Sequence, residues 1–253
     1  TKAILVVAGE GKRLRPYTLD RPKCMVEING VSLIDRQLSV LESEGIDNIV
    51  MIGGYKSEMI KKDGVKFKNN PIYFKTNMVW TLFCAEEELR GECIVSYGDI
   101  VYSKDILQKL LQSTDDITVA IDMDWESYWR LRDENPLNDA ETLKMQDNAV
   151  IKEIGKKPKS LDEIEGQYMG LIKLSDKGVK QMKRVFHAAV KKGVLLNKDV
   201  KNLYMTDLLQ AMIEYGYKVS ALPIYGGKWI EVDTVKDLKN PITRKRLEEI
   251  SCG

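Results

Sequence analysis

A short apolar run, Ala3–Ala8, gives way at once to glycines at positions 9 and 11. Such a run is typical of a strand buried on both faces, as in a parallel sheet that helices cover. The arrangement returns twice: Asn48–Ile52 ends at Gly53 and Gly54, and Cys93–Tyr97 ends at Gly98 and Asp99. Amphipathic stretches separate these runs, so strands and helices alternate. The pattern predicts an α/β chain with a doubly wound, mostly parallel sheet.

The same periodicities place the remaining elements. Helices are predicted at 32–44, 79–89, 103–111, 176–191 and 205–215, and further strands at 72–74, 117–122, 150–154, 168–174 and 218–223. After Asp122 the chain turns polar and irregular. We therefore predict one domain over 1–253, with an inserted acceptor or lid lobe at 124–166 and a C-terminal helical segment at 234–251.

Composition excludes several classes of protein. With 39 basic and 38 acidic residues, the net charge of +1 gives no electrostatic case for bulk binding to nucleic acid or membranes. His187 is the only histidine, and the cysteines at 24, 84, 93 and 252 form no C-x-x-C pair, which argues against structural zinc. His187 lies in a helical-looking stretch, which disfavours a histidine-dependent hydrolase. Scattered thiols, and the lack of a signal-peptide pattern, predict a cytoplasmic protein.

The loop after the first strand carries the clearest chemistry. Its glycines let backbone N–H groups approach phosphate oxygens. Arg13 and Lys23 add fixed positive charge beside them, as phosphoryl chemistry requires. The loop is neither a dinucleotide fingerprint nor a Walker loop, because the third glycine and the Gly-Lys-Ser/Thr ending are absent. On these residues alone, it is either a phosphate-binding loop or a tight turn with solvated basic side chains.

The exact string resembles the nucleotidyltransferase signature G-x-G-x-R-L-x-P-x-T-x-x-x-P-K, matched by Gly9, Gly11, Arg13, Leu14, Pro16, Thr18, Pro22 and Lys23. Val7 departs from the family, which more often has alanine there. The resemblance implies the Rossmann-like nucleotidyltransferase fold and two catalytic residues, Lys23 at the α-phosphate and Arg13 at the β- and γ-phosphates. It implies nucleotide contacts from Ala8, Gly9, Glu10, Gly11, Lys12, Gly53, Gly54, Tyr55, Thr76, Asn77 and Gly98.

Two aspartates extend the resemblance. Asp99 follows a predicted strand, and Asp233 lies in Trp229–Thr234. The matching aspartates of the family hold the Mg²⁺ that bridges the α-phosphate, and Mg²⁺ prefers one or two carboxylates together with phosphate and water. Taken alone, Asp99 is equally explained as a turn residue, and Asp233 as a cap of the following helix.

The middle and end of the chain are similar to cytidylyltransferases of small phosphonates and phosphate monoesters. The similar segments are 77–82, 125–129, 139–142, 166–171 and 229–234. This resemblance implies transfer of CMP from CTP to an acceptor such as 2-aminoethylphosphonate, 2-hydroxyethylphosphonate, phosphocholine or phosphoglutamine, with loss of pyrophosphate. It also makes a homodimer possible. The resemblance leaves several pathways open: phosphonate tailoring, teichoic acid or lipopolysaccharide decoration, and capsule modification. The preference for CTP over UTP or dTTP comes from the resemblance alone.

Each candidate on the acceptor side has a second interpretation. Trp125, Tyr128 and Trp129 either form an aromatic wall against a cationic acceptor or fill the core of the inserted lobe. Asp139 and Glu141 either bind an acceptor ammonium group or a second metal, or are simply solvated. The resemblance also assigns the acceptor phosphate to Lys157 or Lys156, which otherwise form a basic turn, and it adds Tyr168 to the acceptor side.

Two rival functions remain at this point. A hexose-1-phosphate uridylyl- or thymidylyltransferase would share the first loop but would need contacts to sugar hydroxyls in the lobe. A non-catalytic nucleotide-sensing domain would tolerate loss of the charged site residues, whereas Arg13, Lys23, Asp99 and Asp233 are all present.

Overall fold

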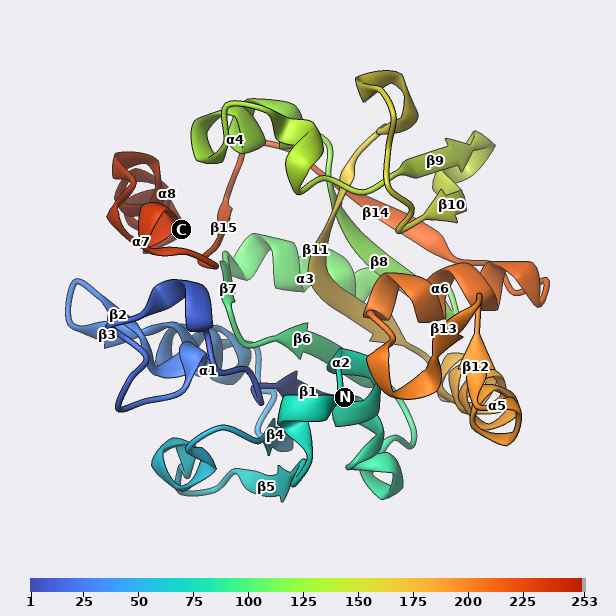
Figure 1. Cartoon of the computed structure of the whole chain (residues 1–253), viewed down its shortest axis with the longest axis horizontal. Helices are drawn as coiled ribbons and strands as arrows, with labels where there is room; N and C mark the ends of the chain where they lie inside the picture. The colour runs from blue at the N-terminus through green and yellow to red at the C-terminus, as the bar shows by residue number, and fades with distance from the viewer. Residues whose placement is uncertain (252–253) are drawn as a thin grey trace.

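A nine-stranded sheet forms the centre of the computed structural model, which describes residues 1–251, with Asn148 and Ser251 described by backbone alone. Figure 1 shows the sheet with helices around it. In spatial order the strands are β5 (Lys66–Asn69), β4 (Ile49–Gly53), β1 (Lys2–Val6), β6 (Cys93–Tyr97), β11 (Gln167–Leu174), β8 (Ile117–Asp122), β14 (Ser220–Ile224), β10 (Val150–Ile154) and β9 (Leu143–Gln146). The predicted α/β class is confirmed.

Strand directions explain where a site forms. β1 runs parallel to both β4 and β6, and β8 runs parallel to β14. β11 joins the two groups and is antiparallel to β6 and β8, so the sheet is mixed. The N–H of Gly98 donates to the carbonyl oxygen of Val6 at 3.1 Å, which places the ends of β6 and β1 side by side. The carboxyl ends of parallel strands are where α/β sheets bind ligands.

Helices cover both faces of the sheet because β1 is apolar on both. Ile4 and Val6 face a core that includes residues of α2 (Met78–Phe83), α5 (Asp176–Lys192) and α6 (Met205–Glu214). Ala3 and Leu5 face a second core with α1 (Leu33–Ser43), α3 (Lys104–Gln112) and α4 (Trp125–Arg132). A third cluster joins Leu14 of the first loop to α7 (Val235–Lys239) and α8 (Pro241–Ser251).

Two predicted elements are wrong. Residues 72–74 belong to a 3-10 turn, Tyr73–Lys75, and the strand is β5 instead. β5 reads Lys-Phe-Lys-Asn and lies at the sheet's edge with exposed ends, so it lacks the apolar run that marks a buried strand. The helix expected over 79–89 ends at Phe83, and a separate 3-10 turn covers Glu86–Glu88. There Glu88 turns inward to a buried ion pair with Lys2 at 2.8 Å.

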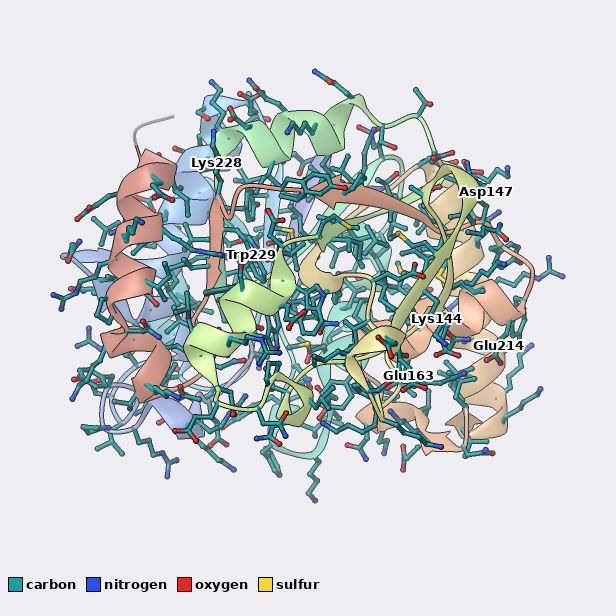
Figure 2. The ribbon with its side chains drawn as sticks, turned by 90° about the horizontal axis from the view of Figure 1, so that it is seen from above. Lys144, Asp147, Glu163, Glu214, Lys228 and Trp229 are labelled. Carbon is teal, nitrogen blue, oxygen red and sulfur yellow. The ribbon has the colours of Figure 1, made fainter. Side chains whose placement is uncertain are left out.

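The segment 124–166 is continuous with the central sheet. β10 pairs with β14, and β9 pairs with β10, so β10 and β9 extend the edge of the central sheet. Figure 2 labels Lys144 and Asp147 in this region.

Among residues 1–251, no helix has the length and apolar character needed to cross a membrane. Cys252 lies outside the described residues.

Candidate active site

Gly11 fixes the shape of the first loop. Its φ of 63° lies in the left-handed region, which costs residues with a Cβ atom energy. A Cβ there would lie 3.0 Å from Cγ2 of Thr18 and 3.1 Å from Cβ of Lys23. Thr18, fully buried, donates from Oγ1 to the Gly11 carbonyl at 2.8 Å. The glycine and threonine of the signature therefore hold the loop against the residue that carries the lysine.

A small two-stranded ladder brings the two aspartates together. β7 (Ile100–Tyr102) pairs antiparallel with β15 (Trp229–Glu231), and Ile100 lies opposite Glu231. Asp99 precedes the first strand, and Asp233 follows the second. In Figure 1 the dark blue first loop lies beside the junction of β7 and β15, although these segments are far apart in the sequence. The ladder thus delivers both carboxylates to the first loop.

Lys23 connects the two carboxylates. Its Nζ donates to Oδ2 of Asp99 at 2.5 Å and also to Oδ1 of Asp233. Burial alone would lower the pKa of Lys23, but Asp99 and Asp233 outweigh burial and raise that pKa, so the ammonium stays charged. Burial likewise opposes ionisation of Asp233, and Lys23 is the main cause of its lowered pKa. Three residues that the sequence predicted for catalysis and metal binding thus meet at one point.

A cavity of about 390 Å³ opens beside this cluster. It is lined by the predicted catalytic residues Arg13 and Lys23 and by many of the predicted nucleotide contacts, namely Ala8, Gly9, Glu10, Gly11, Lys12, Thr76, Asn77 and Gly98. Seven further lining residues were not predicted from the sequence, namely Val6, Val7, Cys24, Tyr73, Phe74, Met78 and Thr81. Met78 and Thr81 lie in the segment 77–82 that is similar to cytidylyltransferases, whereas Tyr73 and Phe74 are marked only by their closeness to Thr76.

The other three predicted nucleotide contacts, Gly53, Gly54 and Tyr55, do not line the cavity. Gly54 lies under Tyr73, where a Cβ would come within 2.6 Å of the tyrosine Cβ. Gly53 is buried beneath Phe67 and Ile60. Tyr55 donates from its N–H to the carbonyl oxygen of Ala8 at 3.2 Å. These residues support the cavity but are not among those that line it.

The aspartates suit a divalent cation that a substrate helps to hold. Oδ1 of Asp99 is buried and has no hydrogen-bond partner, which is costly for a charged oxygen unless a ligand supplies one. No group of three or more His, Cys, Asp or Glu side chains within the described part of the chain could hold a metal. Two carboxylates plus phosphate oxygens and water match the ligand set of Mg²⁺.

Arg132 supports Asp233, and no sequence pattern pointed to this residue. It lies at the end of α4 and is buried. Its Nη1 lies 2.7 Å from Oε2 of Glu231, its Nε lies 3.0 Å from Oδ1 of Asp237, and its Nη2 lies 3.8 Å from Oδ2 of Asp233. Arg13 approaches the same Asp233 oxygen at 3.5 Å but is exposed to solvent.

The three predicted acceptor-side aromatic rings lie in the protein core. Trp125, Tyr128 and Trp129 are at most 4% exposed and pack edge to face with one another and with Trp229, which Figure 2 labels. Arg132 and Arg246 lie over the Tyr128 ring, at 5.4 and 3.8 Å from its centroid. The rings are therefore closed to a cationic acceptor, and the interpretation as a wall for one does not fit this structure.

The remaining acceptor candidates lie in two places. Tyr168 packs edge to face on Tyr97, next to Gly98, with ring centroids 5.5 Å apart. Glu141 interacts electrostatically with both tyrosines and accepts a hydrogen bond from Oγ1 of Thr206 at 3.3 Å. Burial raises the pKa of Glu141 to about 7. Asp99 interacts electrostatically with the same two tyrosines.

Asp139, Lys156 and Lys157 are more loosely placed. Asp139 is exposed and interacts electrostatically with Glu141. Lys156 pairs with Glu153 at 2.7 Å. Lys157 donates from Nζ to the carbonyl oxygens of Leu137 and Asn138, the latter at 2.8 Å. Each lysine thus already has a partner outside the cluster around Lys23.

Known proteins resemble this chain along its whole length. Residues 3–139 match the family model of the MobA-like NTP transferase domain. A CTP:phosphoglutamine cytidylyltransferase of Campylobacter jejuni is 41% identical over 254 residues, covering 96% of this chain and 99% of its own. A choline-phosphate cytidylyltransferase of Streptococcus pneumoniae is 33% identical over 117 residues, covering 45% of this chain and 51% of its own.

Solved structures share the fold. The CTP:phosphocholine cytidylyltransferase of Streptococcus pneumoniae superposes with a TM-score of 0.73 at 24% identity, covering 99% of this chain and 98% of that one. The nucleotidyltransferase fold predicted from the first-loop signature is therefore confirmed.

Proposed function

The chain belongs to the family of MobA-like NTP transferases, and on that premise we propose that it is a cytidylyltransferase that moves CMP from CTP to phosphoglutamine or a chemically similar acceptor. Cytidylyl transfer to a small phosphate acceptor is supported by the Campylobacter jejuni relative, which aligns over nearly all of both chains. The observation that carries the proposal is the meeting of Lys23, Asp99 and Asp233 beside the glycine loop.

In the proposed reaction, a phosphate oxygen of the acceptor attacks the α-phosphorus of CTP. The bond from that phosphorus to the bridging oxygen of the pyrophosphate breaks, and pyrophosphate leaves with the electron pair. The acceptor oxygen is already anionic, so no side chain has to remove a proton. The work left to the protein is to bring two anions together and to offset their charge.

Charged residues of the site divide this work. Lys23 would stabilise the charge that develops at the α-phosphate. Arg13 and the N–H groups of the glycine loop would bind the β- and γ-phosphates. Asp99 and Asp233 would hold a Mg²⁺ ion, which in such sites offsets charge on the α-phosphate and the leaving group. Thr76 and Asn77, which also line the cavity, would face the cytosine.

Glu141 is our candidate for the acceptor's amino group. Phosphoglutamine carries a primary ammonium that donates hydrogen bonds, whereas the quaternary ammonium of phosphocholine cannot and is bound by aromatic cages. Glu141 supplies a carboxylate that interacts with Tyr168, as Asp99 also does, while Trp125, Tyr128 and Trp129 are buried. This contrast favours an acceptor with a primary ammonium group.

The remaining predictions from the sequence concern two lysines, Asp139, the homodimer and the location. Lys157 and Lys156 stay our candidates for the acceptor phosphate, which they would reach only after leaving Asn138 and Glu153 respectively. Asp139 would add negative charge beside Glu141. The homodimer and the cytoplasmic location stay predictions from the sequence.

Pyrophosphate release tests the proposal. The protein is incubated with CTP, UTP or dTTP in the presence of Mg²⁺, each with phosphoglutamine, phosphocholine, 2-aminoethylphosphonate or glucose 1-phosphate. We expect release with CTP and phosphoglutamine, and none when the Mg²⁺ is chelated. Release only with glucose 1-phosphate and UTP or dTTP would contradict the proposal. His187→Ala serves as the control, because His187 pairs with Glu86 on the outside of α5.

A further inference from the structure

The two carboxylates of the site are held in place by the backbone. The N–H of Val232 donates to the carbonyl oxygen of Asp99 at 3.0 Å and ties the segments that carry Asp99 and Asp233 together. The N–H of Asp233 donates to Oδ2 of Asp237 at 3.0 Å. Neither aspartate can therefore move far from the other without breaking the β7–β15 ladder.

The cation between them is the mobile partner. Lys23 reaches Asp99 and Asp233 from the short 3-10 turn Lys23–Met25 at the end of a long side chain. A lysine ammonium is a compact charge on a flexible four-carbon stem, so it can leave one pair of oxygens for another without moving the backbone. Its side chain is only 15% exposed, and those of Asp99 and Asp233 are 9% and 13% exposed, so few water molecules compete for these oxygens.

A divalent cation shared by both aspartates would lie in the space between them, although Oδ1 of Asp99 is left without a hydrogen-bond partner. Mg²⁺ binds carboxylate oxygens at about 2.0–2.1 Å and so must lie between them. Oδ2 of Asp99 and Oδ1 of Asp233 already face the ammonium of Lys23. Two cations cannot occupy one position between two carboxylates. Lys23 and a bridging metal ion therefore exclude each other.

We propose that Lys23 closes the divalent-cation site of the nucleotide-free protein, and that the α-phosphate of CTP opens it by drawing the ammonium away. The inference rests on the proposed function, which supplies that phosphate. It explains why a lysine assigned to the α-phosphate contacts two aspartates instead. Because coupling between two ligands is reciprocal, nucleotide and metal strengthen each other's binding.

Mn²⁺ binding tests this without any turnover. Free Mn²⁺ is measured by electron paramagnetic resonance during titration of the whole protein alone, with CMP and with cytidine. CMP carries the α-phosphate but lacks the chelating triphosphate. We expect CMP to tighten Mn²⁺ binding, within the range of about 5- to 150-fold that is usual for coupled sites, and cytidine to leave it unchanged. Equal Mn²⁺ affinity with and without bound CMP would overturn the inference.

Two matched variants distinguish displacement of the Lys23 ammonium from a general effect of net charge on Mn²⁺ binding. In the nucleotide-free protein, Lys23→Met should bind Mn²⁺ at least about tenfold more tightly than the wild type, because the competing cation is gone. Arg13→Met removes a positive charge that also lies near Asp233, at 3.5 Å, but does not stand between the aspartates. It should change Mn²⁺ affinity far less. An equal gain in both variants would show that net charge alone controls the site and would overturn the inference.

Binding of CMP itself is measured in parallel by calorimetry. Bound CMP with no gain in Mn²⁺ affinity would overturn the inference and leave the proposed function standing. Failure of CMP to bind at all would overturn the inference, whereas the proposed function is overturned only if CTP supports no pyrophosphate release. If Lys23→Met does not fold, Lys23→Gln, which also removes the charge, takes its place in the comparison with Arg13→Met.

Discussion

Nε of Arg132 lies 3.0 Å from Oδ1 of Asp237, joining α4 to α7 through two side chains that are 7% and 5% exposed. Asp237 in turn accepts, through Oδ2, the N–H groups of Asp233 and Thr234 at 3.0 and 2.9 Å. The chain of contacts runs from the middle of the sequence to a metal-binding candidate. Arg132 is therefore a positioning residue for Asp233.

Arg132→Met should destabilise the protein strongly. The change leaves Asp237 buried and Glu231 partly buried without their cation, and breaking a buried charge pair costs about 3–5 kcal/mol. Urea unfolding measures the loss. Arg130→Met is the matched control on the same helix, because Arg130 and its partner Glu126 are about half exposed and such pairs are worth at most about 1 kcal/mol. Similar losses in both variants would contradict this role.

Asp99→Asn should remove most turnover and leave the fold intact. Asparagine keeps the shape of the side chain but gives up the negative charge that Lys23 and a divalent cation would share. We expect the rate of pyrophosphate release to fall by about a hundredfold or more, as is usual when one electrostatic contact in an active site is lost. Circular dichroism checks the fold, and near-normal release would show that Asp99 is not in the site.

Glu141 predicts a pH dependence for the acceptor. Burial raises the pKa of its carboxyl to about 7, so the group is mostly neutral at pH 6 and mostly charged at pH 8. If the charged form binds the acceptor's ammonium, kcat/KM for phosphoglutamine should rise as pH increases through about 7. Ionisation of the acceptor phosphate, near pH 6, adds to the same rise.

Glu141→Gln separates the two contributions. The variant should keep only the rise in kcat/KM that comes from ionisation of the acceptor phosphate. Its kcat/KM should be lower than that of the wild type above pH 7 and closer to the wild-type value below pH 7. A profile parallel to wild type would rule out Glu141 as the titrating group. Stability changes in the opposite direction, because a raised carboxyl pKa means that folding stability is lost as pH rises from 4.5 through about 7. Glu141→Gln should therefore gain stability relative to wild type at pH 8.

Gly11→Ala tests how the backbone conformation and packing of Gly11 shape the glycine loop. Alanine at φ 63° costs about 1–2 kcal/mol for the backbone alone, and its Cβ would also press against Thr18 and Lys23. Gly216→Ala is matched for backbone strain, at φ 84°, but has open space around it. We expect a larger loss of thermal stability for Gly11→Ala, together with weaker CTP binding. Equal losses and unchanged binding would mean that the loop tolerates the extra atom.

Much of the fold could be predicted because the buried strands carry unbroken apolar runs. β6 and β8 have the predicted bounds, and β1 and β4 differ from the prediction by one or two residues at their ends. β5 was not predicted because it is an edge strand with lysines and lacks such an apolar run. The first loop was identified from its spacing, and Gly11 and Thr18 show why that spacing is required.

The rest of the site depends on contacts that local sequence does not encode. β7 and β15 have three residues each, too few for a periodicity, yet their pairing brings Asp99 to Asp233. Arg132 carries no signal of its own, because a charged residue at a helix end is usually solvated. Trp125, Tyr128 and Trp129 have an apolar pattern that fits either a ligand wall or a core, and only the packing with Trp229 distinguishes them.

The β7–β15 ladder also has a consequence for biosynthesis. A nascent chain that has emerged as far as β6 and β7 already holds the glycine loop, Lys23 and Asp99. It still lacks the strand that carries the second carboxylate, because β15 is made last among the strands. Until that strand pairs with β7, Lys23 has a single acidic partner and the site is incomplete. An interrupted translation product would therefore have no complete site with which to consume CTP.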